Sequence, residues 1–205
     1  MNPRSRSATV SSNLRDRIRQ STADDILAAA EAVFAEQGLR NAPMGEIAAR
    51  AGMAVGTLYN HFADKESLVE ALRSARSEEL LARLDDALGQ GAFAEQLTAF
   101  VESLWSHYEA HSRLFLALMG EDQGAGAPSG KRKAAMSEVY QRAQKLIERG
   151  IHARVLRADP EHLLPSMLLG LIKGMSIRSM CAQSDWPVVD TARAVDFFLS
   201  GARRG

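Results

Sequence analysis

The residues with the most evident chemical potential lie in one short polar stretch of the sequence. Its members are Thr57, Tyr59, Asn60 and His61, followed by Lys65. Their hydroxyl, amide, imidazole and ammonium groups can hydrogen-bond the phosphates or the base edges of nucleic acid. None of these side chains carries a negative charge that would repel DNA. The stretch therefore predicts a surface that contacts duplex DNA.

The elements around this stretch are predicted to form a helix-turn-helix at about residues 43–62. Pro43 suits the first position of a short helix, and Gly52 ends that helix at a tight turn before a second one. Small side chains let the two helices touch, and apolar side chains anchor them: Ala48, Ala49 and Ala51, then Ile47, Met53, Leu58 and Phe62. Asp64 is the expected N-cap of a longer helix that supports the pair.

The sequence from Ile26 to Leu68 resembles the TetR family of bacterial transcriptional regulators. The matching residues are Ile26-Leu27, Phe34, Gly38, Ile47-Ala48, Ala51-Gly52, Gly56-Thr57-Leu58-Tyr59, Phe62, Lys65-Glu66 and Leu68. The resemblance implies that the second helix of the pair enters the major groove of DNA. It also implies that Tyr59 and Lys65 meet phosphates, and that their neighbours Thr57, Asn60 and His61 make the remaining DNA contacts.

Four positions depart from the family pattern. Ala42 and Pro43 stand where a Thr or Ser usually caps the first helix of the pair, so Asn41 is the expected cap instead. Ala54 replaces the usual Ser cap of the recognition helix. Val55 stands where a polar or basic residue is common, which leaves it a methyl contact to thymine or no contact.

Residues 1–20 are predicted to be a basic, flexible arm. They hold the arginines Arg4, Arg6, Arg15, Arg17 and Arg19 against the single acid Asp16. Such a segment is either a solvated tail or a DNA-binding arm, and the family resemblance favours the arm. Arg17 and Arg19 are its candidate DNA contacts, immediately before a first helix that should begin at Ser21 or Thr22.

Residues 21–75 are assigned to DNA binding, and residues 76–205 are predicted to form a second, helical domain. Apolar residues recur at helical spacing over 93–108 and 131–156, and further helices are expected from Asp159-Pro160 and from Pro187. Residues 120–130 are expected to form a mobile loop. The basic side chains within 131–149 are expected to form a solvated helix face. With about nine helices and no convincing strand, the predicted fold class is all-α.

The resemblance implies that the second domain binds a small molecule and forms a homodimer. An apolar or amphipathic effector is expected, lined by Trp105, Tyr108, Phe115, Met119, Met136, Tyr140, Met167 and Met175. Its polar anchors would be His107, Glu102 or Arg113. The dimer is expected through helices 160–182 and 187–199, where Gly170 and Gly174 let partner helices approach closely.

Other functional classes find little support in the sequence. The 25 Lys and Arg residues balance the 25 Asp and Glu residues, so a DNA-binding face requires local segregation of charge. His107 and His111 are one helical turn apart, but no third ligand follows at metal-binding spacing, so neither a metal site nor a cofactor is predicted. The lone Cys181 cannot form an intrachain disulfide. No catalytic set, signal peptide or membrane span is evident, which favours a soluble, cytoplasmic protein that is not an enzyme.

The sequence therefore predicts a homodimeric, ligand-responsive transcriptional regulator of operator DNA, a repressor that its effector releases. The alternative is a helical small-molecule-binding protein without DNA-binding activity. Ala54 and Val55 favour that alternative, whereas the intact polar stretch of residues 57–65 opposes it.

Overall fold

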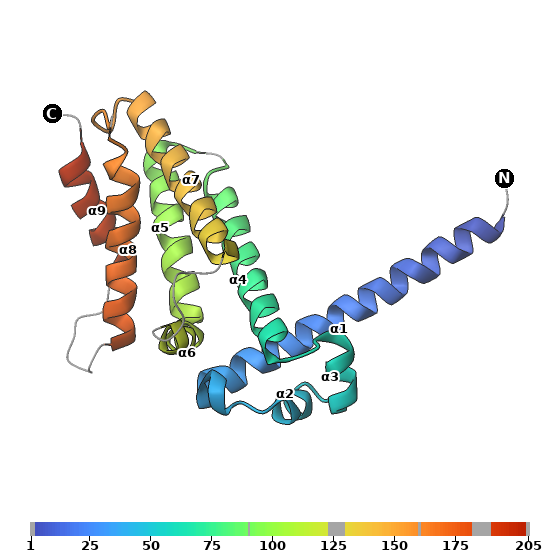
Figure 1. Cartoon of the computed structure of the whole chain (residues 1–205). Helices are drawn as coiled ribbons and strands as arrows, with labels where there is room; N and C mark the ends of the chain where they lie inside the picture. The colour runs from blue at the N-terminus through green and yellow to red at the C-terminus, as the bar shows by residue number, and fades with distance from the viewer. Residues whose placement is uncertain (1–2, 90, 123–129, 160, 182–189, 204–205) are drawn as a thin grey trace. The chain divides into compact units, whose positions relative to one another are not determined.

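The computed structural model describes the backbone of residues 3–89, 91–122, 130–159, 161–181 and 190–203. It describes side chains for residues 17–89, 91–117, 133–159, 161–179 and 190–203. Every extended regular element in these ranges is a helix, which confirms the predicted all-α fold class (Figure 1). The helices are α1 (Pro3–Asn41), α2 (Met44–Arg50), α3 (Val55–His61), α4 (Lys65–Ala87), α5 (Phe93–Ala110), α6 (Ser112–Asp122), α7 (Gly130–His152), α8 (Leu163–Cys181) and α9 (Thr191–Ala202). No helix in the described part of the chain is long and apolar enough to cross a bilayer.

The chain divides into two compact units, Met1–Ala75 and Arg76–Gly205. The first unit holds α1, α2, α3 and the beginning of α4. Within it α2 packs against α1 and α3 packs against α2, along the C-terminal half of α1 (Figure 1). Phe34, Ile47 and Leu58 contribute fully buried side chains from these three helices. Burial of each such side chain contributes about 1.5–3 kcal/mol to folding, which holds two short helices on one long one.

Helix α1 begins much earlier than the sequence analysis predicts. The structure continues it back to Pro3, so the predicted start at Ser21 or Thr22 is wrong. The hydroxyl of Thr22 does not cap a helix; it donates to the carbonyl oxygen of Ile18, one turn earlier, at 2.8 Å. Neither Gly nor Pro occurs between Arg4 and Gln37, so nothing in this segment interrupts helical hydrogen bonding. At Gly38 the backbone turns into the left-handed region, with φ of 76°, and the helix kinks there.

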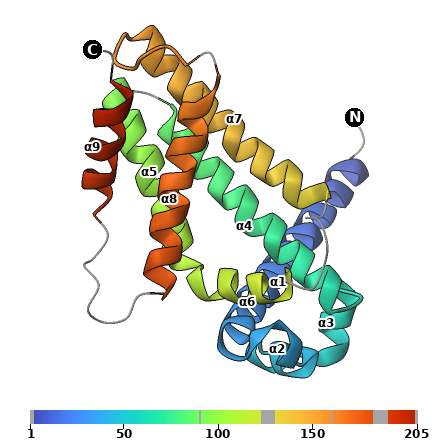
Figure 2. The ribbon, with the colours of Figure 1, turned by 60° about the vertical axis from the view of Figure 1, so that its left-hand side comes forward.

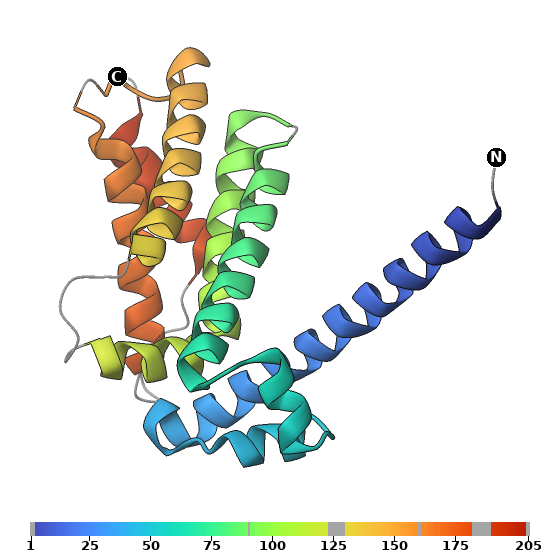
Figure 3. The same cartoon turned by 45° about the vertical axis from the view of Figure 1, so that its right-hand side comes forward.

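The second unit is a bundle in which α5 packs against α7, α8 and α9 (Figure 2). Helix α6 contacts α5 and α8 and crosses one end of the bundle (Figure 3). The shared core is almost entirely aliphatic and aromatic, and its members include Leu97, Phe100, Val101, Leu104, Leu146, Ile147, Leu164, Leu168, Ile172, Val195, Phe198 and Leu199. These residues recur every three or four positions on each helix, which is why the sequence periodicity located the helices.

The starts of α8 and α9 differ from the predicted ones or lie beyond the described residues. Helix α8 begins at Leu163 and not at Asp159-Pro160. His162 has a left-handed backbone, with φ of 53°, so the helix cannot extend back through it. Asp159 still caps the helix, because its two carboxylate oxygens accept the backbone N–H groups of Leu163 and Leu164 at 2.9 Å each. The expected start at Pro187 and most of the expected loop at 120–130 lie outside the described residues.

Two arginines of α7 are not on the solvated face that the sequence predicts. Arg142 forms a two-pronged ion pair with Asp85 of α4, at 2.7 and 2.9 Å, and a second ion pair with Glu138 at 2.7 Å. Arg149 donates to the carbonyl oxygen of Leu88 and, at 3.1 Å, to the side-chain oxygen of Gln96. A guanidinium presents a planar fork of hydrogen-bond donors. Each arginine therefore connects α7 to α4, to the segment after α4 or to α5, and does not point into water.

Candidate nucleic-acid interface

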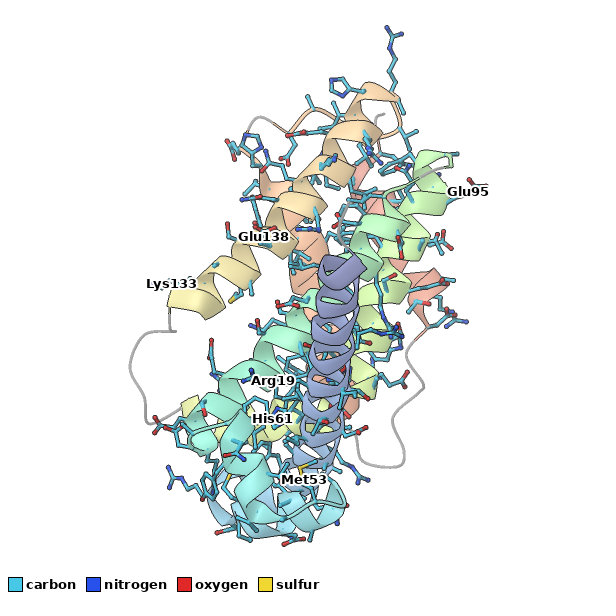
Figure 4. The ribbon with its side chains drawn as sticks, turned by 90° about the vertical axis from the view of Figure 1, so that its right-hand side faces the viewer. Arg19, Met53, His61, Glu95, Lys133 and Glu138 are labelled. Atoms are coloured by element: carbon cyan, nitrogen blue, oxygen red, sulfur yellow. The ribbon has the colours of Figure 1, made fainter. Side chains whose placement is uncertain are left out.

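The turn between α2 and α3 is closed by backbone hydrogen bonds. The N–H groups of Ala51, Gly52 and Met53 donate to carbonyl oxygens of α2 at 2.9, 3.1 and 2.9 Å. Gly52 has a φ of 70°, and a side chain there would raise the energy of the left-handed backbone. The chain can therefore reverse within a few residues, as the sequence predicts. Figure 4 labels Met53 at this turn and His61 at the far end of α3.

Helix α2 is fixed to α1 by polar contacts as well as by its apolar face. Gln37 donates to Glu46 at 2.7 Å, and Arg50 forms an ion pair with Glu36 at 2.6 Å. The hydrogen bond with Glu36 raises the pKa of Arg50, whose guanidinium stays charged. Both pairs join residues distant in the sequence, so they orient α2 on the long helix.

Neither short helix has a side-chain cap at its N-terminus. Pro43 and Ala54 occupy the N-cap positions of α2 and α3 without a capping hydrogen bond. The expected cap by Asn41 is wrong, because its amide donates back to the carbonyl oxygen of Gln37 at 3.4 Å. Asn41 belongs to the end of α1, and it finishes that helix instead of starting the next.

Helix α3 separates one buried side from one polar side. Leu58 is fully buried, whereas Thr57, Tyr59 and Asn60 are exposed, with 48% of Tyr59 accessible to solvent. Val55 is also exposed, and His61 is half-buried with its ring 6.3 Å from that of Phe62. At 100° per residue, Leu58 lies opposite Gly56 and Asn60, so the helix is held by its apolar residue and presents the polar ones.

Lys65 has a structural role that the sequence analysis missed. Its ammonium nitrogen Nζ donates to the carbonyl oxygens of Leu39 and Arg40, at 2.9 and 3.2 Å. These carbonyls lie at the C-terminal end of α1, where a cation also interacts favourably with the helix dipole. An ammonium group has three N–H donors, so one donor remains for another acceptor.

Asp64 caps α4 as predicted. Its carboxylate accepts the backbone N–H of Ser67 at 2.7 Å, and the Ser67 hydroxyl accepts the backbone N–H of Asp64 at 3.2 Å. The backbone and hydroxyl hydrogen bonds from Ser67 lower the pKa of Asp64. The reciprocal cap fixes the chain between the end of α3 and the start of α4, which places Lys65.

The candidate basic arm enters this region as part of α1. Arg17 and Arg19 are exposed on that helix, and Figure 4 labels Arg19. The side chains of Arg4, Arg6 and Arg15 lie outside the described set. The two described arginines project from an ordered helix, which limits where they can reach.

In the second unit, the predicted effector-lining residues fall into separate environments. Tyr108 and Phe115 pack with their rings 5.2 Å apart, and burial raises the pKa of Tyr108. Trp105, Tyr140 and Met175 are half-buried, and the Tyr140 hydroxyl donates to the carbonyl oxygen of His162 at 3.2 Å.

Met136 and Met167 are 59% and 54% exposed, and the Met119 side chain lies outside the described residues. Of the expected polar anchors, His107 is buried, whereas Glu102 and Arg113 are exposed. The predicted lining residues therefore differ in their exposure to solvent.

One side of α8 is apolar and uncovered. We use the term α8 face for Leu163, Met167, Gly170, Gly174 and Ile177, all of them exposed. Their spacing places them within one narrow stripe of the helix. A Cβ atom built on Gly170 or Gly174 meets nothing within 4 Å, so no other part of the described chain covers the stripe there. On α9, Phe197 is 74% exposed.

Comparison with known proteins places this helix-turn-helix in a family. Residues 26–72 match the family model for bacterial regulatory proteins of the tetR family. The chain is 26% identical over 172 residues to the HTH-type transcriptional regulator UidR of Escherichia coli K12, covering 82% of this chain and 88% of UidR. It is 41% identical over 68 residues to the HTH-type transcriptional repressor KstR2 of Mycobacterium tuberculosis H37Rv, covering 33% of this chain and 34% of KstR2.

A solved structure agrees with both units of the fold. The TetR family transcriptional regulator PfmR of Thermus thermophilus superimposes with a TM-score of 0.69 at 23% sequence identity. The superposition covers 87% of this chain and 99% of PfmR. The helix-turn-helix segment of this chain therefore matches the tetR family of bacterial regulatory proteins, and most of the chain is similar in sequence to a transcriptional regulator and in fold to a solved TetR family structure.

Proposed function

We propose that this regulator binds operator DNA with α3 in the major groove. The observation that carries the proposal is the two-sided character of α3, with Leu58 fully buried and Thr57, Tyr59 and Asn60 exposed. An α-helix fits the major groove, where each base pair presents a distinct pattern of donors and acceptors. A helix held by its inner side keeps its polar side chains in fixed positions as they meet the bases.

The exposed residues of α3 divide into base-reading and phosphate-binding groups. The Asn60 amide has both a donor and an acceptor, so it can pair with the two major-groove atoms of an adenine. The Tyr59 hydroxyl reaches a phosphate, and Thr57 and His61 bind at the margins of the same site. Val55, exposed and apolar, contacts a thymine methyl group.

Lys65 connects the DNA backbone to the end of α1. Two of its donors hold the carbonyls of Leu39 and Arg40, and the third binds a phosphate. Arg17 and Arg19 contribute further phosphate contacts from α1. In this arrangement the cations supply affinity without sequence preference, and α3 supplies the preference.

Regulators of this family bind operator DNA and dimerise. For this chain, we place the dimer interface on the α8 face, together with the exposed Phe197 of α9. A two-fold axis brings the same stripe from each protomer together, and Gly170 and Gly174 permit close approach of the two α8 helices. Such a dimer requires two half-sites about 34–36 Å apart, related by the same two-fold symmetry.

The effector is a small apolar or amphipathic molecule that binds within the second unit. Its binding makes the protein, a repressor, dissociate from operator DNA. Its candidate lining consists of the predicted residues that are half-buried and so keep some surface for a ligand: Trp105, Tyr108, Phe115, Tyr140 and Met175. Met136 and Met167 are more exposed, and Met167 serves the α8 face. The structure of one similar protein, KstR2 of Mycobacterium tuberculosis, has been solved, and that protein is a ketosteroid transcriptional regulator. An apolar effector for the present chain is consistent with this similarity. Binding of the effector and of DNA must weaken each other by the same factor.

The proposal is tested by fluorescence anisotropy with duplexes from the region upstream of the protein's own gene. Tyr59→Ala should weaken binding to every sequence alike, since it removes a phosphate contact. Asn60→Ala should weaken the preferred sequence by about 1–3 kcal/mol and alter sequence preference, since it removes a base contact. Ser106→Ala is the matched control, because this exposed residue of α5 lies in the other unit.

Equal effects of the α3 substitutions and the control would refute the interface. The outcome would then favour the alternative, a small-molecule-binding protein without DNA-binding activity. The comparisons do not favour that alternative, because the relatives that they identify are transcriptional regulators and repressors. A location in the cytoplasm, where bacterial DNA lies, follows from the same proposal.

A further inference from the structure

A carboxylate and two histidines that lie far from it in the sequence meet in the second unit. Glu79 comes from α4, His107 from α5 and His111 from the position just after α5. One possible ligand atom from each lies within 4.8 Å of the other two. The two imidazole rings have centroids 4.7 Å apart. The third ligand that the sequence analysis did not find is therefore supplied by another helix.

His107 provides a second, independent indication of a ligand. It is only 2% exposed, and its Nδ1 atom is the one buried side-chain polar atom in the described chain without a hydrogen-bond partner. Buried polar atoms in folded proteins almost always have partners, because an unsatisfied one costs about 1–3 kcal/mol. Phe115 and Tyr108 pack edge-on against the same ring, so its surroundings are otherwise apolar.

The protonation states at the cluster suit a metal ion. Burial, with the nearby charges of His111, Arg83 and Arg76, lowers the pKa of His107 to about 4, so the ring is neutral near pH 7. Burial raises the pKa of Glu79, but its hydrogen bond with Arg76 and the nearby positive charges lower it overall. A neutral imidazole and an ionised carboxylate are the forms that bind metals.

The distances are compatible with coordination after small side-chain rotations. Zinc binds imidazole nitrogen and carboxylate oxygen at about 2.0–2.2 Å, so ligand atoms at tetrahedral corners lie roughly 3.3 Å apart. The present atoms lie within 4.8 Å of one another, and they must close by at most about 1.5 Å. The 3.9 Å separation between His111 Nε2 and Glu79 Oε2 is already close to that value.

Two arginines compete with a metal ion for the carboxylate. Arg76 and Arg83 form ion pairs with Glu79 at 2.8 and 2.7 Å. A carboxylate has about four lone-pair sites, so it can keep an arginine and still bind an ion. The two positive charges nonetheless repel a cation and weaken the site.

We propose that Glu79, His107 and His111 bind a divalent transition-metal ion of the zinc type, with water completing the coordination. The set of two imidazoles and one carboxylate is a common donor set for such ions. This site is distinct from the DNA-binding surface of the first unit, and metal binding does not depend on the proposed function. By joining α4 to the α5–α6 junction, the ion stiffens the contact between these helices.

The test uses the full-length protein, first stripped of metal with a chelator and then titrated with Zn²⁺ and Co²⁺. Calorimetry measures affinity and stoichiometry, and the visible absorption of Co²⁺ reports the coordination geometry. We expect one ion per protomer. His111→Ala and Glu79→Gln should each weaken binding by at least about 10–100-fold, the usual cost of removing even an indirect partner of a metal ligand. Circular dichroism verifies that each variant remains helical.

Two further variants make the result specific. His152→Ala is the matched control, because it removes an exposed histidine from the end of α7 and should leave metal affinity unchanged. Arg83→Gln should tighten binding several-fold, because it removes a repelling charge. Absence of binding by the wild-type protein overturns the proposal. So does equal loss of affinity in His111→Ala and His152→Ala, which would indicate nonspecific histidine binding.

Discussion

Replacement of Gly174 by leucine tests the proposed dimer without disturbing the protomer. A Cβ atom at this position meets nothing within 4 Å, so the side chain has room on the isolated fold. Leucine also favours a helix over glycine, by somewhat less than the about 0.8–1 kcal/mol that separates alanine from glycine. The Gly174→Leu protomer should therefore fold, and its free energy of unfolding should be equal to or slightly above that of the wild type.

In the dimer the same substitution should be costly. Overpacking of a close interface costs about 1–3 kcal/mol per site, and two-fold symmetry doubles this to about 2–6 kcal/mol. The dissociation constant of the dimer should then rise by roughly 30-fold to 10⁴-fold. The variant should also bind DNA poorly, because one recognition helix cannot occupy two half-sites.

Sedimentation over a range of protein concentrations measures the dissociation constant of the dimer. Thermal unfolding, followed by circular dichroism, measures the stability of the fold. Ser106→Leu is the matched control, because it adds the same side chain to an exposed position of α5 away from the α8 face. A Gly174→Leu variant that dimerises as tightly as the wild type would refute the placement of the interface.

Three other substitutions test the structural account. Gly52→Ala should lower the free energy of unfolding by about 1–2 kcal/mol in urea titrations, because a side chain is strained at its φ of 70°. No neighbour lies within 4 Å of the added Cβ, so the loss would come from backbone strain alone. An unchanged free energy of unfolding would contradict the turn geometry. Gly150→Ala should cost about 1–3 kcal/mol, because its Cβ would lie 2.6 Å from Phe93 Cε2 and 2.7 Å from Leu156 Cδ1; an unchanged Tm would show that this contact is looser. Asp64→Ala should destabilise the protein near neutral pH. Because folding lowers the pKa of Asp64, its contribution is present above the unfolded pKa of about 3.9 and is lost as pH falls through the folded value. Urea titrations of both proteins should therefore converge in acid, and a constant difference would contradict the role of the ionised cap.

Local sequence signals located the helix-turn-helix well because its determinants are themselves local. Gly52 permits the turn, Leu58 anchors α3 and Asp64 caps α4, and each is recognisable from residue type and spacing. The start of α1 was mispredicted for the converse reason. Thr22 has the side chain of a cap, but its hydroxyl can also bond within a continuing helix, and local sequence does not distinguish the two states.

The contacts that the sequence did not reveal join residues that are distant in the chain. Lys65 binds the carbonyls of Leu39 and Arg40, and Glu79 approaches the pair His107 and His111, through helix packing alone. No spacing rule within one helix can indicate such a contact. The effector-lining residues are the hardest case, because an apolar side chain has the same helical periodicity whether it faces a core, a ligand or a second subunit.

The central claim, that this regulator binds operator DNA through α3 and a surrounding set of cations, is tested most directly by the salt dependence of binding. The full-length protein is titrated against a duplex from upstream of its own gene and against a scrambled duplex of equal length. With about 6–10 phosphate contacts per dimer, affinity for the upstream duplex should fall by roughly 10³–10⁵-fold between about 50 and 200 mM salt, and it should exceed affinity for the scrambled duplex throughout. A flat salt dependence, or equal affinity for both duplexes, would contradict the account.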